Sequence, residues 1–258
     1  MKFNQALITG ATSGIGECLA HLLAKKEIPL ILTGRNREKL EELKTQLSER
    51  VPVTIVEADL ALKEGRDSLI QVIQEKTPDL VINNAGFGLY GSILRYSVAE
   101  QMKIFEVDGQ AVLELTLEAA HALHNAGKNG VILNVSSAAG FFVFPSFAVY
   151  AATKDFVTHV SASLDYELAP KGIRVLAACP GMVKTEFRHR AGGRLDKDKI
   201  EWMSAEFAAQ EIWKQIVSGK RTHLFNWKYR LAYWFSRLIP QGVLAHFQQK
   251  TIGVHKPH

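Results

Sequence analysis

The stretch "TGATSGIG", Thr9 to Gly16, decides the fold. It follows the apolar run "QALIT" at 5–9 and precedes a helical pattern from Gly14 to about Lys26. Glycines at 10, 14 and 16 permit a tight turn, close approach of the backbone to a ligand, and close packing of the helix on the strand. The helix would aim its N-terminal amides at a pyrophosphate. Glycines also end strands for purely structural reasons, so the position between strand and helix is what indicates a nucleotide site.

Outward from this turn, apolar runs of strand length alternate with segments of helical period. Leu40, Leu43 and Leu47 recur at helical intervals in "NREKLEELKTQLSER". Further strand-like runs lie at 29–34, 52–60, 79–86, 130–137 and 173–181. Such alternation predicts one doubly wound α/β domain, with a parallel sheet covered by helices on both faces. We expect the cofactor-binding and catalytic core over 1–187, and a substrate lid and amphipathic extension of the same domain over 188–258.

Composition and length bound the class of protein. The chain has 258 residues, of which 47% are hydrophobic and 22% charged, as in ordinary globular proteins. Two cysteines, Cys18 and Cys179, are too few for a disulfide framework, and neither has a metal-ligand companion at a useful spacing. We therefore expect no metal site and a cytoplasmic setting. No secretory signal or membrane-spanning run is evident, and a net charge of +5 is too diffuse to indicate nucleic-acid binding.

The second predicted strand ends in "LTGRNR", which bears on the choice of cofactor. Enzymes that prefer NAD often carry an acidic residue here, which accepts hydrogen bonds from the ribose 2′-hydroxyl. This chain has Arg35 and Arg37 instead. A guanidinium pairs well with a phosphate, so the sequence favours NADP(H) over NAD(H). The alternative is that both arginines only solvate the start of a helix.

The stretch "YAATK" places Tyr150 and Lys154 four residues apart, on one face of a helix. Tyrosine has an ordinary pKa near 10, and a nearby positive charge favours the phenolate. The pair could serve as a general acid and base, but the same spacing arises by chance in many helices. Other residues must supply the reaction.

Four motifs that occur in one order along the chain indicate what the reaction is. With "TGATSGIG", "NNAG" at 83–86, "SS" at 136–137 and "YAATK", the chain from about Ala6 to Thr185 resembles the short-chain dehydrogenase/reductase family. The resemblance implies a Rossmann-type fold, a nicotinamide cofactor and hydride transfer between a carbonyl and an alcohol. By this likeness Tyr150 is the acid/base, Lys154 lowers its pKa and holds the nicotinamide ribose, and Ser137 polarises the substrate carbonyl. Ser136 is the neighbouring candidate, but the family's spacing to the tyrosine favours Ser137.

The same likeness implies the remaining cofactor contacts. Asp59 and Leu60 match the adenine site, "NNAG" matches the adenosine-ribose wall, and "PGMVKT" at 180–185 matches the segment that holds the nicotinamide amide. The expected contacts, besides Arg35, Arg37, Tyr150 and Lys154, are Gly10, Thr12, Ser13, Gly14, Ile15, Gly16, Asp59, Leu60, Asn83, Ala85, Gly86, Pro180, Gly181, Val183 and Thr185.

One position departs from the family. A helix before the serine strand usually carries an asparagine that orders a water chain to the lysine, and Asp108 stands there in this chain. An ionised carboxylate accepts hydrogen bonds but cannot donate as an amide does. Asp108 could still support the relay, raise the pKa of Lys154, or have left the role. Gly109 beside it indicates close packing.

The tail carries a second pattern. "EFRHRAGGRLDKDK" at 186–199 fits a mobile lid. In 226–250, Leu231, Trp234, Phe235 and Leu238 form an apolar helical stripe flanked by basic residues, and Pro240 should break it. The stripe could dock on the domain or a second subunit, lie on a membrane surface, or wall an apolar substrate. Val243, Leu244 and Phe247 continue it.

The sequence therefore predicts an NADP(H)-dependent oxidoreductase that acts on an apolar or lipid-like carbonyl or alcohol, with possible peripheral membrane contact. By analogy with the family we expect a homodimer or homotetramer. The alternative is a nucleotide-binding regulatory or membrane-surface protein that keeps the fold without turnover. The two hypotheses differ in whether the catalytic side chains come together and in what the tail contacts.

Overall fold

Side chains along the central strands alternate between two hydrophobic cores. In the first strand Ala6 and Ile8 enter one core, while Leu7 enters the other. The second strand repeats this with Leu30 and Leu32 against Ile31. Because side chains of a strand point to opposite faces in turn, this pattern requires a sheet that is covered on both sides.

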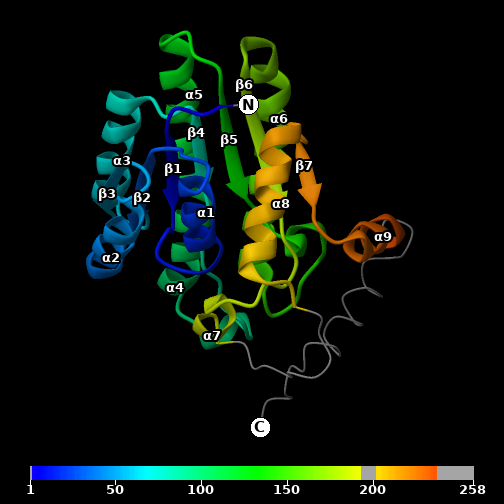
Figure 1. The fold of residues 1–258 in the computed structure, drawn as a ribbon. Coiled ribbons are helices and arrows are strands. Elements are labelled where there is room, and N and C mark those ends of the chain that lie inside the picture. The colour runs from blue at the N-terminus through cyan, green and yellow to red at the C-terminus, as the bar shows by residue number, and fades with distance from the viewer. Residues whose placement is uncertain (1, 193–201, 237–258) are drawn as a thin grey trace.

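The computed structural model describes residues 2–192 and 202–236 of the chain. Its described part contains a seven-stranded sheet in the order β3-β2-β1-β4-β5-β6-β7 (Figure 1), in which all neighbouring strands are parallel. The strands are β1 (Ala6–Thr9), β2 (Leu30–Gly34), β3 (Val53–Glu57), β4 (Leu80–Asn83), β5 (Gly130–Val135), β6 (Ile173–Cys179) and β7 (Thr222–Leu224).

Helices cover both faces, as predicted. One core is closed by α1, α2 and α8, and the other is closed mainly by α3 and α5, with the end of α6 packed beside them. The α-helices are α1 (Gly14–Ala24), α2 (Arg37–Leu47), α3 (Lys63–Lys76), α4 (Val98–Phe105), α5 (Ala111–Asn125), α6 (Ala148–Leu168), α7 (Phe187–Arg190), α8 (Ala205–Ser218) and α9 (Trp227–Ser236). Short helical turns lie at η1 (Ile93–Arg95), η2 (Glu106–Gln110), η3 (Ala138–Phe141) and η4 (Ala169–Lys171), and η2 is π-helical.

The order of the strands fixes where a ligand can bind. The chain runs outward from β1 to β3 and then returns to place β4 on the other side of β1. In open sheets of this kind the crevice lies at the carboxyl ends of the strands, where the direction of winding reverses. The glycine turn between β1 and α1 lies at that point.

The segment after Thr185 contributes more to the core than its sequence indicates. Helix α8 buries Ala208, Ala209 and Ile212 against the same core as α1, and β7 extends the sheet beside β6. The predicted lid at 186–199 is described only as far as Gly192, where it forms the short helix α7. Helix α9 carries the first part of the predicted stripe. Leu238, Pro240, Val243, Leu244 and Phe247 lie outside the described residues.

Candidate active site

The glycine turn after β1 lies against the loops that follow β4 and β6. Gly10 and Gly14 have φ angles of 65° and 58°, in the left-handed region that favours glycine. A Cβ atom on Gly10 would lie 2.8 Å from Cα of Ala85, and one on Gly14 would lie 3.0 Å from Cγ2 of Thr185. A side chain on Gly16 would overlap the Gly10 carbonyl. The glycines therefore let three loops meet where α1 begins.

Thr12, Ser13 and Ile15 of this turn are all partly buried. Ile15 packs partly buried against the core under α1. Thr12 packs beside Gly34 at the end of β2, where a Cβ atom would lie 2.9 Å from Cγ2 of Thr12. Ser13 holds the N-cap position of α1 without a capping hydrogen bond from its side chain. Hydroxyls and helix amides at this end of the sheet suit an anionic ligand.

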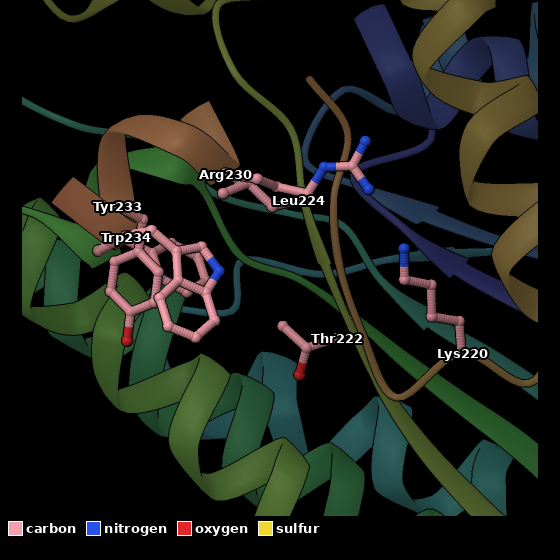
Figure 2. A pocket seen from close by; sticks show the side chains of 7 residues that line it. Lys220, Thr222, Leu224, Arg230, Tyr233 and Trp234 are labelled. Carbon is pink, nitrogen blue, oxygen red and sulfur yellow. The ribbon is translucent and has the colours of Figure 1, made fainter. Parts of the chain in front are cut away.

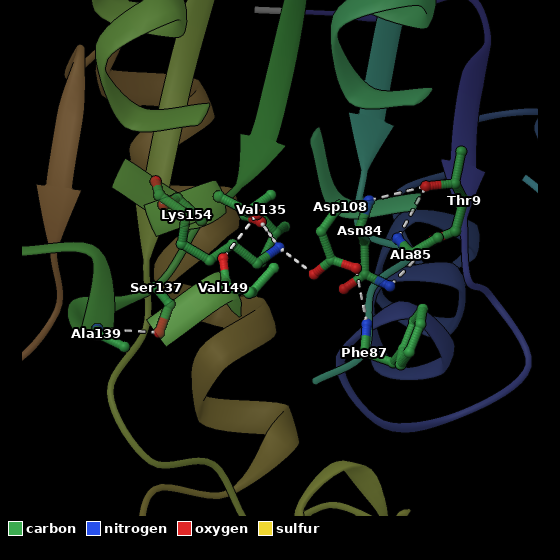
Figure 3. Close-up of polar contacts among 12 residues, drawn as sticks. Thr9, Asn84, Ala85, Phe87, Asp108, Val135, Ser137, Ala139, Val149 and Lys154 are labelled. Atoms are coloured by element: carbon green, nitrogen blue, oxygen red, sulfur yellow. Dashed lines mark hydrogen bonds and ion pairs between the residues drawn. The ribbon is translucent and has the colours of Figure 1, made fainter. Parts of the chain in front are cut away.

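Thr9 and Asn84 join the ends of β1 and β4. The backbone amides of Asn84 and Ala85 both donate to Oγ1 of Thr9, each at 2.9 Å, and Nδ2 of Asn84 donates to the Thr9 carbonyl at 3.0 Å (Figure 3). The sequence analysis assigned neither residue a role in the site. The paired asparagines of "NNAG" were the available signal, because adjacent residues leaving a strand point in opposite directions.

The side chain of Asn83 lies in the interior, which limits its expected role. Its Nδ2 donates to Oδ1 of Asn134 at 2.8 Å and to Oγ1 of Thr116 at 3.2 Å. Because this side chain is engaged in the interior, only the backbone of Asn83 can contribute to the adenosine-ribose wall that the family resemblance implied. Gly86, by contrast, lies directly beside Asp108, because a Cβ atom there would meet Oδ2 of that carboxylate at 2.6 Å.

A hollow of about 430 Å³ lies beyond β2 and β3, at the predicted adenosine end. Arg35 and Asp59 line it together with Glu57, Ala58, Glu64, Gly65 and Ser68. Oδ1 of Asp59 accepts a hydrogen bond from the Ala61 amide at 3.1 Å, which fixes the carboxylate at the rim, and Leu60 is buried beneath. Arg37 does not line the hollow. It pairs with Glu41 at 3.8 Å and with Glu57 at 3.9 Å on the exposed start of α2.

At the other end, the predicted catalytic side chains come together. Tyr150 and Lys154 lie one turn apart on α6, and the Lys154 ammonium lies 5.5 Å from the centre of the Tyr150 ring. Ser137, which follows β5, hydrogen-bonds the Tyr150 hydroxyl, and its Oγ also accepts from the Ala139 amide at 3.1 Å. Oγ of Ser136 points away and donates to the Lys154 carbonyl at 2.6 Å. Of the two serines, Ser137 is the one that faces the phenol.

Asp108 and Lys154 form a buried ion pair in the same place (Figure 3). Nζ of Lys154 lies 3.0 Å from Oδ2 of Asp108 and donates to the Val135 carbonyl at 3.0 Å. The other carboxylate oxygen accepts from the Phe87 amide at 2.9 Å. Burial raises the pKa of Asp108, and the ammonium and the amide oppose that rise. The π-helical turn η2 presents the carboxylate to the lysine, and sequence periodicity did not indicate this turn.

Aromatic rings enclose Tyr150. Its ring stacks on Phe147 at a centroid distance of 4.3 Å, and Phe147 stacks on Tyr90 at 3.8 Å. Burial raises the pKa of Tyr150 well above its ordinary value, the charge of Asp108 raises it further, and the hydrogen bond from Ser137 lowers it. The family resemblance implies that Lys154 lowers this pKa, and that role stays a prediction.

The segment 180–185 closes the site from the side of β6. The Pro180 carbonyl accepts from the Ala138 amide at 2.8 Å, which ties the segment to the Ser137 loop. Val183 forms an isolated β-bridge with Met203. Oγ1 of Thr185 faces the start of α7 and accepts from the Phe187 amide at 3.3 Å. Tyr229 of α9 packs on Gly181, where any Cβ atom would overlap its ring, and hydrogen-bonds the Met182 backbone.

This geometry matches a known family. The family model for short chain dehydrogenases matches residues 4–195. The chain belongs to that family. An uncharacterized oxidoreductase of Staphylococcus aureus (strain USA300) is 37% identical over 198 residues, which cover 76% of this chain and 84% of the relative. One of Staphylococcus epidermidis is 34% identical over 187 residues, 72% of this chain and 80% of the relative.

Two solved structures share this architecture. A short-chain dehydrogenase from Sphingobium yanoikuyae in complex with NADPH has a TM-score of 0.82 and 27% identity, and the match covers 93% of this chain and 94% of that one. The bulky-bulky ketone specific alcohol dehydrogenase from Comamonas testosteroni has a TM-score of 0.79 and 26% identity, over 94% of each chain. The predicted Rossmann-type fold is confirmed, and the protein is an oxidoreductase of the short-chain dehydrogenase family, which uses NAD(H) or NADP(H).

The arrangement fits a dinucleotide that spans both ends of the crevice. The glycine turn brings the first turn of α1 to the crevice, Arg35 and Asp59 lie at one end, and Tyr150 and Lys154 lie at the other. Within residues 2–192 and 202–236, no helix is both long and apolar enough to cross a membrane.

Proposed function

We propose that this short-chain dehydrogenase interconverts a carbonyl and an alcohol with NADP(H), using Tyr150 as general acid and base. The observation that carries the proposal is the meeting of Ser137, Tyr150 and Lys154 at the carboxyl edge of the sheet, beside the glycine turn. The solved relatives with NADPH bound and with ketone specificity support it by likeness.

Three side chains of the chain have a role in this reaction. NADP(H), when bound, supplies or accepts the hydride. Tyr150 gives a proton to the substrate oxygen during reduction and takes it back during oxidation. Ser137 holds the Tyr150 hydroxyl and the substrate oxygen in one hydrogen-bonded group. Lys154 provides a fixed positive charge near the ring and stabilises the phenolate that reduction leaves behind.

Asp108 acts in this proposal by holding Lys154. Its carboxylate is fixed by the Phe87 amide and pairs with the ammonium at 3.0 Å, so the lysine cannot turn away from the tyrosine. A water relay of the kind that the family's asparagine orders is compatible with this position, because a carboxylate accepts hydrogen bonds from water.

The preference for NADP(H) rests on Arg35. Arg35 lines the hollow at the predicted adenosine end, whereas Arg37 is paired with Glu41 of α2 and Glu57 of β3. A guanidinium in that hollow would pair with the 2′-phosphate, which NAD(H) lacks.

Titration of NADPH and NADH into the purified protein, followed by cofactor fluorescence, tests this choice. We expect tighter binding of NADPH, and we expect Arg35→Ala to weaken NADPH by at least about tenfold while leaving NADH nearly unchanged. Arg37→Ala is the matched control and should change NADPH affinity by less than about threefold. Equal affinities for both cofactors would contradict the preference, and no binding of either would contradict the oxidoreductase proposal.

The surroundings of Tyr150 favour an apolar substrate. Ile104, Phe147 and Tyr150 are buried together, with Phe87, Leu89, Tyr90, Phe144 and Phe187 packed against them. Burial of apolar carbon on these rings would supply most of the binding energy for a bulky ketone or aldehyde. A sugar would leave its hydroxyls without partners there.

The alternative, a fold retained without turnover, is not favoured by the convergence of three catalytic side chains.

We propose a cytoplasmic setting, consistent with the free thiols Cys18 and Cys179. A homodimer or homotetramer is proposed by family likeness alone, and sedimentation equilibrium would decide between them.

A further inference from the structure

Helix α9 turns its apolar stripe away from the domain. The side chains of Trp227, Leu231, Trp234 and Phe235 are 61%, 49%, 74% and 56% exposed. The helix docks instead through the opposite side. Its Tyr233 meets Phe141 edge-on at 4.9 Å, and Tyr229 packs on Gly181. In the described part of the chain, the stripe is therefore left uncovered.

Basic residues border this stripe on both sides. With about 100° between successive residues of an α-helix, Lys228 and Arg230 fall on opposite flanks of the line from Trp227 through Leu231 to Trp234. Both side chains are exposed. An apolar face with a cation on each flank is the pattern of helices that lie in the headgroup region of a bilayer.

A basic hollow adjoins the stripe. It has a volume of about 200 Å³, and its lining combines Lys220 and Arg230 with Phe141, Thr222, Leu224, Tyr233 and Trp234 (Figure 2). Nζ of Lys220 lies 2.9 Å from Nδ1 of His223. Burial lowers the pKa of His223, and the charges of Lys220 and Arg230 add to this lowering, whereas Glu211 opposes it.

The positive charge at this hollow is little compensated. Across residues 2–192 and 202–236, neither Lys220 nor Arg230 has a carboxylate within ion-pairing distance, and the nearby Glu211 is already engaged by Lys214 at 2.7 Å and His223 at 3.1 Å. An anion placed between Lys220 and Arg230 would relieve their mutual repulsion.

We propose that α9 docks on an anionic phospholipid surface, with a lipid phosphate in the hollow between Lys220 and Arg230 and the four exposed apolar side chains in the headgroup region. Tryptophan suits this depth because its ring is apolar while its N–H can still reach water or a headgroup. The cations add attraction to an anionic leaflet.

A second copy of the chain fits this face less well. Two such helices packed face to face would bring Lys228 and Arg230 of both copies close together, and their like charges repel. A helix of ten residues is about 15 Å long, and it offers far less than the roughly 800 Å² per partner of a stable interface.

The docking surface is connected to the proposed active site. Tyr229 and Tyr233 of α9 touch Gly181 and Phe141, which belong to the segments that follow β6 and Ser137. An apolar substrate dissolved in the bilayer would thus meet the enzyme beside its catalytic centre. This consequence rests on the proposed function, whereas the docking itself does not.

Co-sedimentation of the full chain with lipid vesicles, without cofactor or substrate, tests the proposal. We expect binding to vesicles of phosphatidylcholine containing about one third phosphatidylglycerol, weak binding to pure phosphatidylcholine, and loss of binding in about 0.5 M salt. Trp227→Ser/Trp234→Ser and Lys220→Gln/Arg230→Gln should each weaken partition at least about tenfold.

Two matched controls separate this site from general stickiness and charge. Lys128→Gln/Lys171→Gln removes the same charge from exposed residues that precede β5 and β6, at the amino ends of these strands. Leu94→Ser removes an apolar side chain that is 92% exposed elsewhere. Both should bind within about twofold of the unchanged chain. Circular dichroism melts establish that all variants are folded.

Absence of wild-type binding to the anionic vesicles would overturn the proposal, and so would variants of α9 that bind as well as the controls. A dimer that Trp227→Ser/Trp234→Ser dissociates, with no vesicle binding, would assign the face to a second copy and equally overturn it. Because no turnover is measured, failure of the oxidoreductase proposal would leave this result unaffected.

Discussion

The proposed catalytic centre and helix α9 both combine aromatic rings with basic residues, yet they place them in opposite ways. At the centre, Lys154 is buried and finds its partners inside the chain, the Asp108 carboxylate and the Val135 carbonyl, each at 3.0 Å. On α9, Lys228 and Arg230 are exposed, and Trp234 is 74% exposed beside them. The first arrangement is complete in itself. For the second arrangement we propose a contact outside the chain, with a phospholipid surface.

This difference sets the size of the effects that substitutions should have. A buried charge that loses its partner keeps the full cost of desolvation, whereas an exposed charge is already solvated and screened. Changes at the catalytic centre should therefore be large and act on chemistry or folding. Changes on α9 should leave folding intact.

Tyr150→Phe should give the largest effect. The change keeps the ring on Phe147 and removes the proton that the substrate oxygen needs. We expect kcat/KM for an apolar ketone with NADPH to fall by about 10²–10⁴-fold, the usual contribution of a positioned acid or base. Steady-state kinetics measure this loss, and cofactor titration should show NADPH affinity within about threefold of the original. A variant that retains more than a tenth of the activity would assign the proton to another group.

Asp108→Asn should give the next largest effect, on both stability and pH dependence. It leaves Lys154 buried without an anionic partner, which should lower the free energy of unfolding by on the order of 3 kcal/mol in urea titrations. The Asp108 charge raises the pKa of Tyr150, so its removal lowers that pKa. Oxidation needs the phenolate, so its acidic limb should move to lower pH. Reduction needs the phenol, so its alkaline limb should also move to lower pH.

Asp155→Asn is the matched control for this change. It removes the same charge from the next residue of α6, where the side chain is 50% exposed and pairs only with His159 among the contacts of the described chain. The limbs of its pH profile should stay within about 0.3 pH units of the original, because solvent screens that charge. Limbs that do not move in a folded Asp108→Asn variant would show that the carboxylate does not influence Tyr150.

The structural features of this protein differ in how well its sequence predicts them. The parallel sheet, α1 and α2 were predicted correctly because apolar periodicity and glycine spacing are local properties. The meeting of Ser137 with Tyr150 is consistent with family spacing, and the structure places both together. The interior position of Asn83 was not predicted, since the direction of one side chain at the end of a strand depends on the twist of that strand.

Two further features depend on the backbone more than on residue type. Ser146 has a φ of 65°, in a region that serine rarely enters, and the turn there brings Phe147 onto the Tyr150 ring. The π-helical turn that presents Asp108 inserts a residue into a helix that periodicity reads as continuous. On α9 the structure describes only the first part of the predicted stripe, and the tyrosines that dock the helix, which were not predicted to do so, lie on its other side.

Tyr229→Phe should give the smallest effect, and it tests whether the two regions are independent. The Tyr229 hydroxyl hydrogen-bonds the Met182 backbone, and the ring packs on Gly181, so the substitution keeps the packing and removes one hydrogen bond worth about 1 kcal/mol. If α9 steadies the segment that follows β6, KM for NADPH should rise by about two- to fivefold with little change in kcat, because the bond is lost equally in the ground and transition states. Val217→Ser, an exposed change on α8, is the control. An unchanged KM would mean that α9 does not influence cofactor binding. A fall in kcat would mean that the helix influences the chemical step.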